Sequence, residues 1–234
     1  MGKIEKTTLL HTHYLFRDLE GTTIERIAAM GTTRRFGDGE TIFLKGDSGD
    51  ALYGVLSGKV RISTSAPNGR ELILSILDPG AVFGEIALLD GRTRSADAAT
   101  MGAAELFVLQ RREFARFLEQ DSKLAIHLVV MVCERLRSTN DLIGDVTFLK
   151  LPARLAKRLL TFAQYSFEAS QDHTTTEIRI SQYELGLLMG TSRESINRLL
   201  QLWRQDGLVE LGRGRIIVLD PDALQKVVLS ADDD

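Results

Sequence analysis

The stretch that decides the fold is "GAVFGEIALLDGRTRSADAAT", residues 80–100. Gly84 precedes residues 85–89, which can form one turn of helix whose free backbone N–H groups attract anions. Glycine lets the backbone approach a ligand closely, and the guanidinium of Arg94 offers planar donors to phosphate oxygens, with the hydroxyl and N–H of Ser95 beside it. These groups predict an anion site.

Glu85 narrows the choice of anion. A carboxylate beside a bound phosphate is repelled by it unless the carboxylate has a partner of its own, and a ribose hydroxyl would be such a partner. A nucleotide whose phosphate and sugar lie close together would therefore satisfy Arg94 and Glu85 at once. The alternative is that Arg94 and Glu85 simply pair with each other on a turn, and the spacing alone leaves both readings open.

The segments around this stretch predict a strand-rich domain. Between residues 34 and 110 the chain has the short segments "TIFL", "ALYGVL", "KVRIST", "ELILSIL" and "AELFVL", separated by "GDG", "GDSGD", "SG", "PNG" and "DPG". Regular short strands with this punctuation are typical of an antiparallel β-roll or barrel. Before them, the spacing of Thr22 and Glu25 predicts a helix that starts with a capping box. We assign residues 1–120 to this domain.

Residues 121–150 predict one long helix. Seven residues recur there by alternating steps of four and three, and all but Thr139 are apolar: Ala125, Val129, Val132, Leu136, Thr139, Ile143 and Val146. That spacing is typical of a coiled-coil seam and predicts a parallel homodimer. A single amphipathic helix can also pack only on its own domain, and Leu124, Leu128, Met131 and Leu142 supply apolar positions for that. We expect Cys133 to be a small buried hydrophobic residue on this helix.

Residues 151–234 predict a separate winged helix-turn-helix domain. A helix follows Pro152, and residues 168–176 form a polar connection. Ser181 and Glu184 predict a capping box for the first of two helices joined at Gly190, and "LVEL" and "RIIVL" predict a two-stranded wing. The fold class we expect is α+β, with the roll, the long helix and this domain in chain order.

The second helix of the pair carries polar and apolar residues on opposite faces. Ile196, Leu199, Leu200 and Trp203 form the apolar face, and the polar face contains Arg193, Glu194, Asn197, Arg198 and Gln201. Arginine can bind guanine through two hydrogen bonds, and glutamate can accept one from cytosine. We expect phosphate contacts from Arg213 and Arg215 and from the helix with Arg154, Lys157 and Arg158. The alternative is a solvated helix face of mixed charge.

Composition and residue pattern argue against several other classes of protein. The 234 residues carry a net charge of −3 and one cysteine, so the chain forms no internal disulfide and no four-thiolate cluster. No apolar run approaches the roughly 20 residues needed to span a bilayer. His11 and His13 have metal-like spacing but no companions, so we expect neither a metal site nor an enzyme. We expect a cytoplasmic protein without a membrane partner.

The motif "FGEIALLDGRTRSA", residues 83–96, resembles the phosphate-binding cassette of cyclic-nucleotide-binding domains. With the roll, long helix and helix-turn-helix around it, nearly the whole chain resembles the bacterial cyclic AMP receptor protein family. The resemblance implies that Glu85 binds the ribose 2′-hydroxyl, that Arg94 and Ser95 bind the cyclic phosphate, and that Gly84 gives a backbone contact. It also implies that Arg135 lies near the ligand and that Thr139 contacts the base.

Asn140 departs from the serine that is common at this position in enterobacterial relatives. An amide both donates and accepts hydrogen bonds, so Asn140 could serve guanine as well as adenine. We expect cAMP as the main effector, with affinity for cGMP as well, and no other cofactor. The segment "TSRESINRLL" is similar to the family's recognition helix, which implies that Arg193, Glu194 and Arg198 read a TGTGA-like half-site. Double-stranded DNA and RNA polymerase are the expected macromolecular partners. The alternative is a regulator of the same fold that responds to a different effector or to none.

Overall fold

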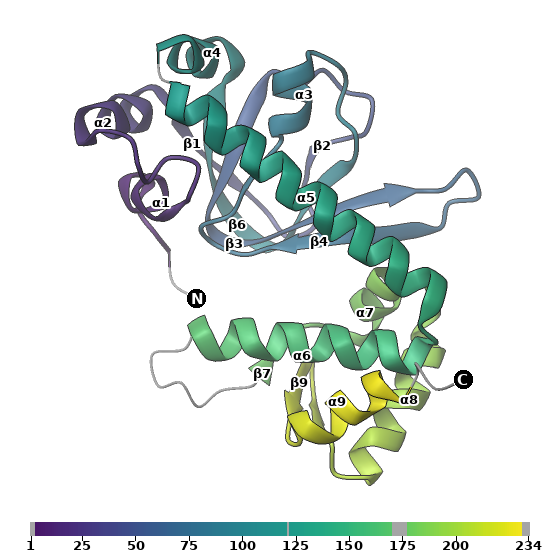
Figure 1. Cartoon of the computed structure of the whole chain (residues 1–234). Helices are drawn as coiled ribbons and strands as arrows, with labels where there is room; N and C mark the ends of the chain where they lie inside the picture. The colour runs from purple at the N-terminus through teal and green to yellow at the C-terminus, as the bar shows by residue number, and fades with distance from the viewer. Residues whose placement is uncertain (1–2, 121, 170–176, 231–234) are drawn as a thin grey trace. The chain divides into compact units, whose positions relative to one another are not determined.

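The computed structural model describes residues 3–120, 122–169 and 177–230 (Figure 1). The chain forms two compact units, one of residues 1–70 and 74–136 and one that contains residues 137–234. The first unit is built on an antiparallel sheet, and the second carries a helix-turn-helix. The prediction of an α+β fold with a β-roll, a long helix and a winged helix-turn-helix is confirmed.

One six-stranded sheet forms the roll. Its strands are β1 (Thr32–Phe36), β2 (Thr41–Phe43), β3 (Ala51–Ser65), β4 (Glu71–Leu77), β5 (Val82–Phe83) and β6 (Asp97–Gln110). The order along the sheet is β1-β6-β3-β4, while β2 pairs with β6 and β5 pairs with β3. The pairings of β1, β2 and β3 with β6 are antiparallel. The anion-site stretch thus connects β5 to β6, beside the long central strand β3.

Strand β3 corrects one prediction. "ALYGVL" and "KVRIST" are not two strands separated by a turn at Ser57-Gly58, because the chain continues as one strand whose register against β6 shifts on either side of Ser57. Gly58 has φ of 78°, and a Cβ there would lie 2.4 Å from the carbonyl oxygen of Ala103. The glycine is needed for a β-bulge, which bends the strand without ending it.

The helices of the first unit close one hydrophobic core. They are α1 (Lys6–Thr12), α2 (Gly21–Met30), α3 (Glu85–Asp90), α4 (Arg111–Gln120) and the first part of α5 (Ser122–Phe148). Phe16, Ile27 and Phe114 lie in this core together with residues of α5. The predicted capping box is wrong, because α2 starts at Gly21 after Glu20 and no side chain caps its first turn.

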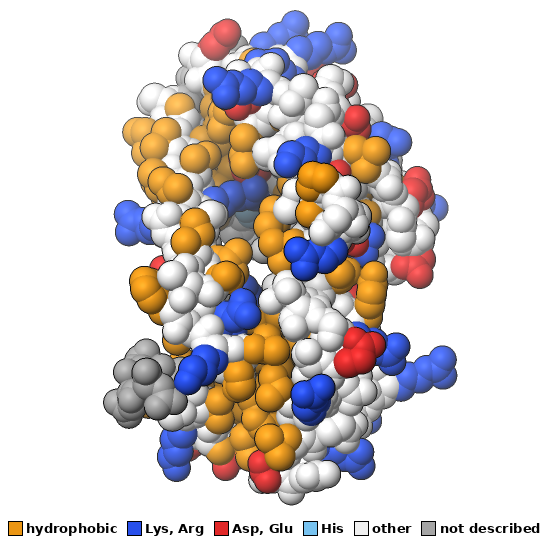
Figure 2. Space-filling view, turned by 90° about the vertical axis from the view of Figure 1, so that its right-hand side faces the viewer, with side chains coloured by type: hydrophobic (Ala, Val, Ile, Leu, Met, Phe, Trp, Pro, Cys, Tyr) orange, Lys and Arg blue, Asp and Glu red, His pale blue; other side chains and the backbone are white. Residues whose placement is uncertain are grey.

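Helix α5 has one face in the core and another exposed. Leu124, Leu128 and Met131 are buried against the roll's other helices. The exposed large hydrophobic residues on α5 are Ile126, Val129, Val130, Val132, Leu136, Ile143, Val146 and Phe148. Hydrophobic side chains are visible on the molecular surface in Figure 2. Four of the predicted seam residues are about 60% exposed, which is unusual for aliphatic side chains unless a partner covers them.

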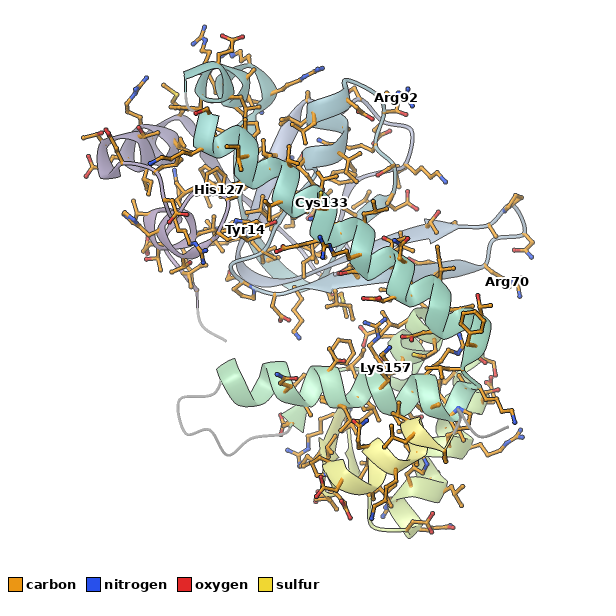
Figure 3. The ribbon with its side chains drawn as sticks, in the orientation of Figure 1. Tyr14, Arg70, Arg92, His127, Cys133 and Lys157 are labelled. Carbon is orange, nitrogen blue, oxygen red and sulfur yellow. The ribbon has the colours of Figure 1, made fainter. Side chains whose placement is uncertain are left out.

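Cys133 is also on the exposed side of α5, and Figure 3 labels it there. The prediction that it is buried is therefore wrong. Cys133 lies four residues after the exposed Val129 and three before the exposed Leu136, so it shares their side of the helix. The sequence alone did not fix which apolar stripe of the helix was buried. The predicted helix start, Asp121, lies outside the described residues.

The second unit packs α6 (Leu151–Ala169) against the winged helix-turn-helix. Its elements are β7 (Glu177–Ile178), α7 (Gln182–Met189), α8 (Arg193–Gln205), β8 (Val209–Gly212), β9 (Arg215–Val218) and α9 (Pro221–Leu229). The strands pair in the order β7-β9-β8. The capping box of α7 is confirmed, with Glu184 N 3.1 Å from Ser181 Oγ and Ser181 N 2.7 Å from Glu184 Oε2. Of the predicted polar connection, residues 170–176 lie outside the described residues.

Candidate functional site

Two glycines in the left-handed region fix the short helix of the anion-site stretch. Gly84, with φ of 85°, precedes α3, and Gly91, with φ of 70°, follows it. A Cβ on Gly84 would lie 2.9 Å from Nη1 of Arg94 and 3.2 Å from the ring of Tyr53. Glycine is therefore required here both by the backbone conformation and by the close approach of Arg94.

Arg94 is folded inward and only 3% exposed. Its Nη1 donates to the carbonyl oxygen of Gly84 and its Nη2 to that of Ala51, both at 2.9 Å. The guanidinium carbon lies 4.3 Å from the ring centroid of Phe43 and 5.5 Å from that of Tyr53. The third nitrogen, Nε, is buried and has no hydrogen-bond partner among the described residues. The cation is thus held between carbonyls and aromatic faces, and its Nε–H remains for a ligand.

Glu85 is fully buried, and its carboxylate pairs with an arginine that is distant in sequence. Oε1 lies 2.6 Å from Nη1 of Arg135 on α5, and Nη2 of Arg135 donates to the carbonyl oxygen of Val82 at 2.8 Å. Oε2 is buried and accepts no hydrogen bond in the described part of the chain. Burial raises the pKa of Glu85, and the charge of Arg135 opposes that rise. A buried acceptor without a donor costs free energy, which a ligand hydroxyl would recover.

The sequence left open whether Arg94 and Glu85 pair with each other. In the structure each has a different partner: Arg94 binds backbone carbonyls, and Glu85 binds Arg135. The structure therefore brings Gly84, Glu85, Arg94 and Arg135 together. The stacking of Arg94 on Phe43 and Tyr53 was not predicted, because aromatic residues in strands are normally expected to belong to the hydrophobic core.

The remaining predicted ligand residues are exposed. Ser95 follows Arg94 directly, and Thr139 and Asn140 lie on α5 about one turn after Arg135. Exposed polar side chains at the apolar seam of a helix weaken its packing against a second helix unless they bind something. Of the three, Ser95 and Asn140 are accessible to a ligand or to a partner chain.

The helix-turn-helix presents most of the predicted base-reading residues to solvent. Ser192 caps α8 by accepting from Ser195 N at 3.2 Å, and Ile196, Leu200 and Trp203 are buried beneath it. The residues Arg193, Glu194, Arg198 and Gln201 are exposed, whereas Asn197 and Leu199 are half-buried. The two faces of the helix therefore separate nearly as the sequence predicts.

A second glycine positions the two helices of this motif. A Cβ on Gly186 of α7 would lie 3.0 Å from the carbonyl oxygen of Thr191 and 3.3 Å from the backbone N of Arg193. Gly186 therefore lets α7 pack directly on the turn that starts α8. The sequence analysis found the turn glycine, Gly190, but missed Gly186, because a glycine inside a helix carries no local signal of what it touches.

The predicted phosphate-contact residues differ in their availability. Arg213 is exposed at the tip of the wing. Arg215 Nη1 lies 3.3 Å from Glu177 Oε2. On α6, Lys157 Nζ lies 2.6 Å from Asp145 Oδ1, and Figure 3 labels this lysine. Arg154 and Arg158 are half-buried. The wing therefore offers freer positive charge than α6 does.

Metal and membrane sites find no support in the residues that the structure describes. Within them no group of three or more His, Cys, Asp and Glu side chains could hold a metal ion, and no helix has the length and hydrophobicity to cross a bilayer. Of the two N-terminal histidines, His13 is half-buried. Its Nδ1 accepts from Leu15 N at 3.2 Å, and its ring centroid lies 4.7 Å from that of Tyr14. His13 is a packed residue with a structural partner.

Comparison with known proteins identifies both units. Residues 33–121 match the cyclic nucleotide-binding domain, and residues 153–227 match the Crp-like helix-turn-helix domain. The chain is 32% identical over 213 residues to the cyclic AMP receptor protein of Thermus thermophilus, which covers 91% of this chain and 95% of the relative. It is 29% identical over 212 residues, with the same coverage, to a CRP-like cAMP-activated global transcriptional regulator of Mycobacterium tuberculosis.

Among solved structures, the c-di-GMP responsive global regulator CLP of Xanthomonas campestris is similar with a TM-score of 0.74 and 28% identity. The match covers 86% of this chain and all of that one. These relatives are transcription regulators and not enzymes, which is the class that the sequence predicts.

Proposed function

Since the chain belongs to the cyclic AMP receptor protein family of transcription regulators, we propose that its first unit binds cAMP and that a homodimer of it reads a palindromic DNA site. The proposed division has a nucleotide-binding roll in residues 1–120, a dimerisation helix in residues 121–150 and a DNA-binding domain in residues 151–234. The protein would act in the cytoplasm, where its DNA and RNA polymerase are found.

One observation carries the ligand proposal: two buried, oppositely charged side chains each retain a polar atom that has no hydrogen-bond partner among the described residues. These atoms are Oε2 of Glu85 and Nε of Arg94. A cyclic nucleotide offers a ribose hydroxyl to the first and a cyclic phosphate to the second. Ser95 and the backbone at Gly84 would add donors to the phosphate. The chemistry of the two free atoms matches the two ends of one ligand.

The base would be bound from α5. Arg135 already contacts Glu85, and Thr139 and Asn140 follow it on the exposed side of the same helix. The amide of Asn140 can serve as donor and acceptor, so it suits guanine as well as adenine. We expect cAMP to bind more tightly than cGMP, and Asn140→Ser to change the ratio of the two affinities. An unchanged ratio would remove Asn140 from the base site.

Dimerisation would link the ligand to DNA. The exposed aliphatic residues of α5 offer a continuous surface for a second copy of the same helix, and Thr139 and Asn140 lie within it. A ligand that prefers one arrangement of the paired helices shifts the dimer toward that arrangement. The competent arrangement places two recognition helices about 34 Å apart, which is one turn of DNA.

The DNA proposal rests on the exposed face of α8. Arg193 and Arg198 would bind guanines and Glu194 would accept from cytosine in a TGTGA-like half-site, with Asn197 and Gln201 beside them. Arg213 and Arg215 of the wing would contact phosphates. Regulation would then require a contact with RNA polymerase.

Calorimetric titration tests the ligand proposal. The wild-type protein is titrated with cAMP and cGMP beside Arg94→Ala and a matched control, Arg92→Ala, whose exposed side chain lies in the same loop. We expect cAMP to bind with a dissociation constant of about 1 μM or less to the wild type and to Arg92→Ala, and not to Arg94→Ala. Equal binding by Arg94→Ala would contradict the proposal.

A second candidate is a regulator of the same fold with another effector. The observation in its favour is the structural likeness to the Xanthomonas regulator, which is named for its response to c-di-GMP. A third titration with c-di-GMP separates the two. Heat with c-di-GMP and none with cAMP would favour this candidate over cAMP.

A further inference from the structure

Helix α5 carries a second exposed apolar stripe beside the predicted seam. Its residues are exposed and recur by steps of four and three: Ile126, Val130 and Cys133. We call them the flanking stripe. With Val129 of the seam at heptad position a, Val130 is at position b, which a single partner helix does not cover. The flanking stripe would therefore face water unless a further surface covers it.

The heptad register fixes the direction in which the flanking stripe faces. In the same register Arg135 is at position g, and Ile126 and Cys133 are at position e. Arg135 contacts the roll of its own chain, with Nη1 2.6 Å from Oε1 of Glu85. In a parallel pair of helices the e positions of one helix lie beside the g positions of the other. The flanking stripe of the partner subunit would therefore face the roll of this chain close to Glu85.

The roll has an exposed apolar surface next to Glu85, on the short helix α3. Glu85 is the first residue of this helix, and its Ile86 and Leu89 are 41% and 40% exposed. Because they are three residues apart, the two side chains share one side of α3. Aliphatic side chains that face water together form a patch that a partner can cover. Two uncovered apolar surfaces, one on α3 and one on α5, thus belong to the same unit.

The opposite side of α3 is fixed against the roll. Ala87 is buried there, and a Cβ on Gly49 would collide with the Cβ of Ala87. The loop between β2 and β3 therefore packs directly on the inner side of α3. Because these contacts hold the helix, its two exposed aliphatic side chains cannot turn inward, and only another surface can remove them from water.

We infer that, in the homodimer, the flanking stripe of the partner subunit packs on Ile86 and Leu89 of α3. A second copy of this chain is the occupant, because pairing along the seam brings the uncovered stripe of one copy to the uncovered patch of the other. The inference rests on the proposed homodimer and deepens it. Since α3 follows Gly84 and begins with Glu85, each nucleotide cassette would be packed against α5 of both copies.

Disulfide trapping tests the contact, because Cys133 is the only cysteine of the chain. A full-length chain with Ile86→Cys and Cys133→Ser is co-expressed with wild-type chains of different tag, and the purified mixture is oxidised. In a mixed dimer the introduced thiol can then bond only to Cys133 of the partner subunit. Leu89→Cys in the same Cys133→Ser background tests the second position. We expect at least one of the two to give at least about tenfold more covalent mixed dimer than the control, since a disulfide needs Cβ atoms about 4 Å apart.

The control places the thiol on another exposed apolar residue of the same unit. Met30 lies at the end of α2 and is 42% exposed, so Met30→Cys with Cys133→Ser reports random collisions. Wild-type chains alone should give little covalent dimer, because the two e positions of a parallel pair lie on opposite sides of the seam.

Charged substitutions test the same contact without a cross-link. Ile86→Asp and Ile126→Asp should each raise the dissociation constant of the dimer, measured by sedimentation, at least about tenfold, because each places a charge in an apolar contact. The double variant should lose less than the product of the two factors, since both residues belong to one contact. Met30→Asp should leave the constant unchanged, and thermal unfolding shows whether each variant is folded.

The outcomes separate this inference from the homodimer on which it rests. If the wild type is a dimer that Val129→Asp dissociates, but neither introduced thiol is trapped and Ile86→Asp dimerises as the wild type does, the inference alone is overturned. An Ile86→Cys chain that keeps Cys133 and forms only an internal disulfide would also overturn it. A wild type that is monomeric with and without cAMP would remove the proposed homodimer and the inference together.

Discussion

The cassette around Glu85 and Arg94 and the face of α8 around Arg198 both present polar groups to a ligand, but in opposite states. The cassette groups are buried and already hold internal partners, so a ligand can only complete or replace existing contacts. The groups on α8 are exposed, so DNA meets side chains that the fold does not need. A substitution in the cassette should therefore change stability and binding together, and one on α8 should change binding alone.

Arg94→Ala should give the largest effect. It removes the cation for the phosphate and leaves the carbonyl oxygens of Gly84 and Ala51 without their donors. We expect nucleotide affinity to fall more than about a hundredfold, and the free energy of unfolding without ligand to fall by about 3 kcal/mol. Calorimetry measures the nucleotide affinity, and urea unfolding measures the free energy of unfolding. An unchanged unfolding free energy would show that Arg94 is not the internal anchor described above, and Arg92→Ala is the control.

Glu85→Gln tests the buried acceptor. The amide keeps one oxygen but loses the charge that strengthens a hydrogen bond from a ribose hydroxyl. We expect cAMP to bind about ten- to a hundredfold more weakly, since hydrogen bonds to charged groups contribute about 1.5 to 3 kcal/mol. The exposed Glu134→Gln on α5 is the matched control. A variant that binds cAMP as well as the wild type does would exclude Glu85 from the ribose site.

Arg198→Ala tests the other side of the comparison. We expect it to cost about 1 to 3 kcal/mol at one guanine of the half-site and to relax discrimination there. Its unfolding free energy should stay within about 0.5 kcal/mol of wild type, because exposed side chains contribute little to stability. Competition binding with single-base variants of the duplex measures the loss of discrimination at that guanine. A uniform loss over all duplexes would place Arg198 on the backbone instead.

The smallest predicted effect is on the pH dependence of stability, and it contrasts the half-buried His13 with the exposed His11. Burial, with a smaller effect from the Arg135 charge, lowers the pKa of His13 from 6.5 to about 4, whereas His11 is exposed. The unfolded chain then binds more protons between these two pKa values. Stability from neutral His13 is therefore fully present above pH 6.5 and lost as pH falls toward 4.

From about pH 7 to about pH 5.5 the loss should be about 1 kcal/mol. His13→Asn, which keeps an acceptor for Leu15 N, should remove this part of the pH dependence in urea unfolding. His11→Asn should keep it. The same pH slope in both variants would contradict the buried, neutral state of His13.

Local signals in the sequence predicted local structure well. The motif at Gly84 to Ser95, the capping box at Ser181 and the polar face of α8 each depend on residues that lie close together in the chain. The capping box at Ser181 is confirmed, whereas the one predicted at Thr22 and Glu25 from an equally local signal is wrong. The fold class also followed from the glycine and asparagine residues between the short apolar segments, although Gly58 lies inside strand β3 and does not end it.

Contacts between distant residues could not be predicted in this way. Residue spacing offers no reason to pair Glu85 with Arg135, fifty residues later, in place of Arg94, and only the family resemblance implied that Arg135 lies near the ligand. Gly58 reads as a turn, since only the approach of Ala103 shows that it is a bulge. Cys133 was placed on the wrong side of α5 because both stripes of that helix are apolar, and packing alone decides which is buried.

The central claim is that a cyclic nucleotide held by Glu85 and Arg94 controls the affinity of α8 for DNA. The most direct test is the fluorescence anisotropy of a labelled TGTGA palindrome titrated with the protein, with and without cAMP, for the wild type and Arg94→Ala. We predict that cAMP tightens binding by the wild type at least about tenfold and leaves Arg94→Ala unchanged. Equal affinity of the wild type with and without cAMP would contradict the claim.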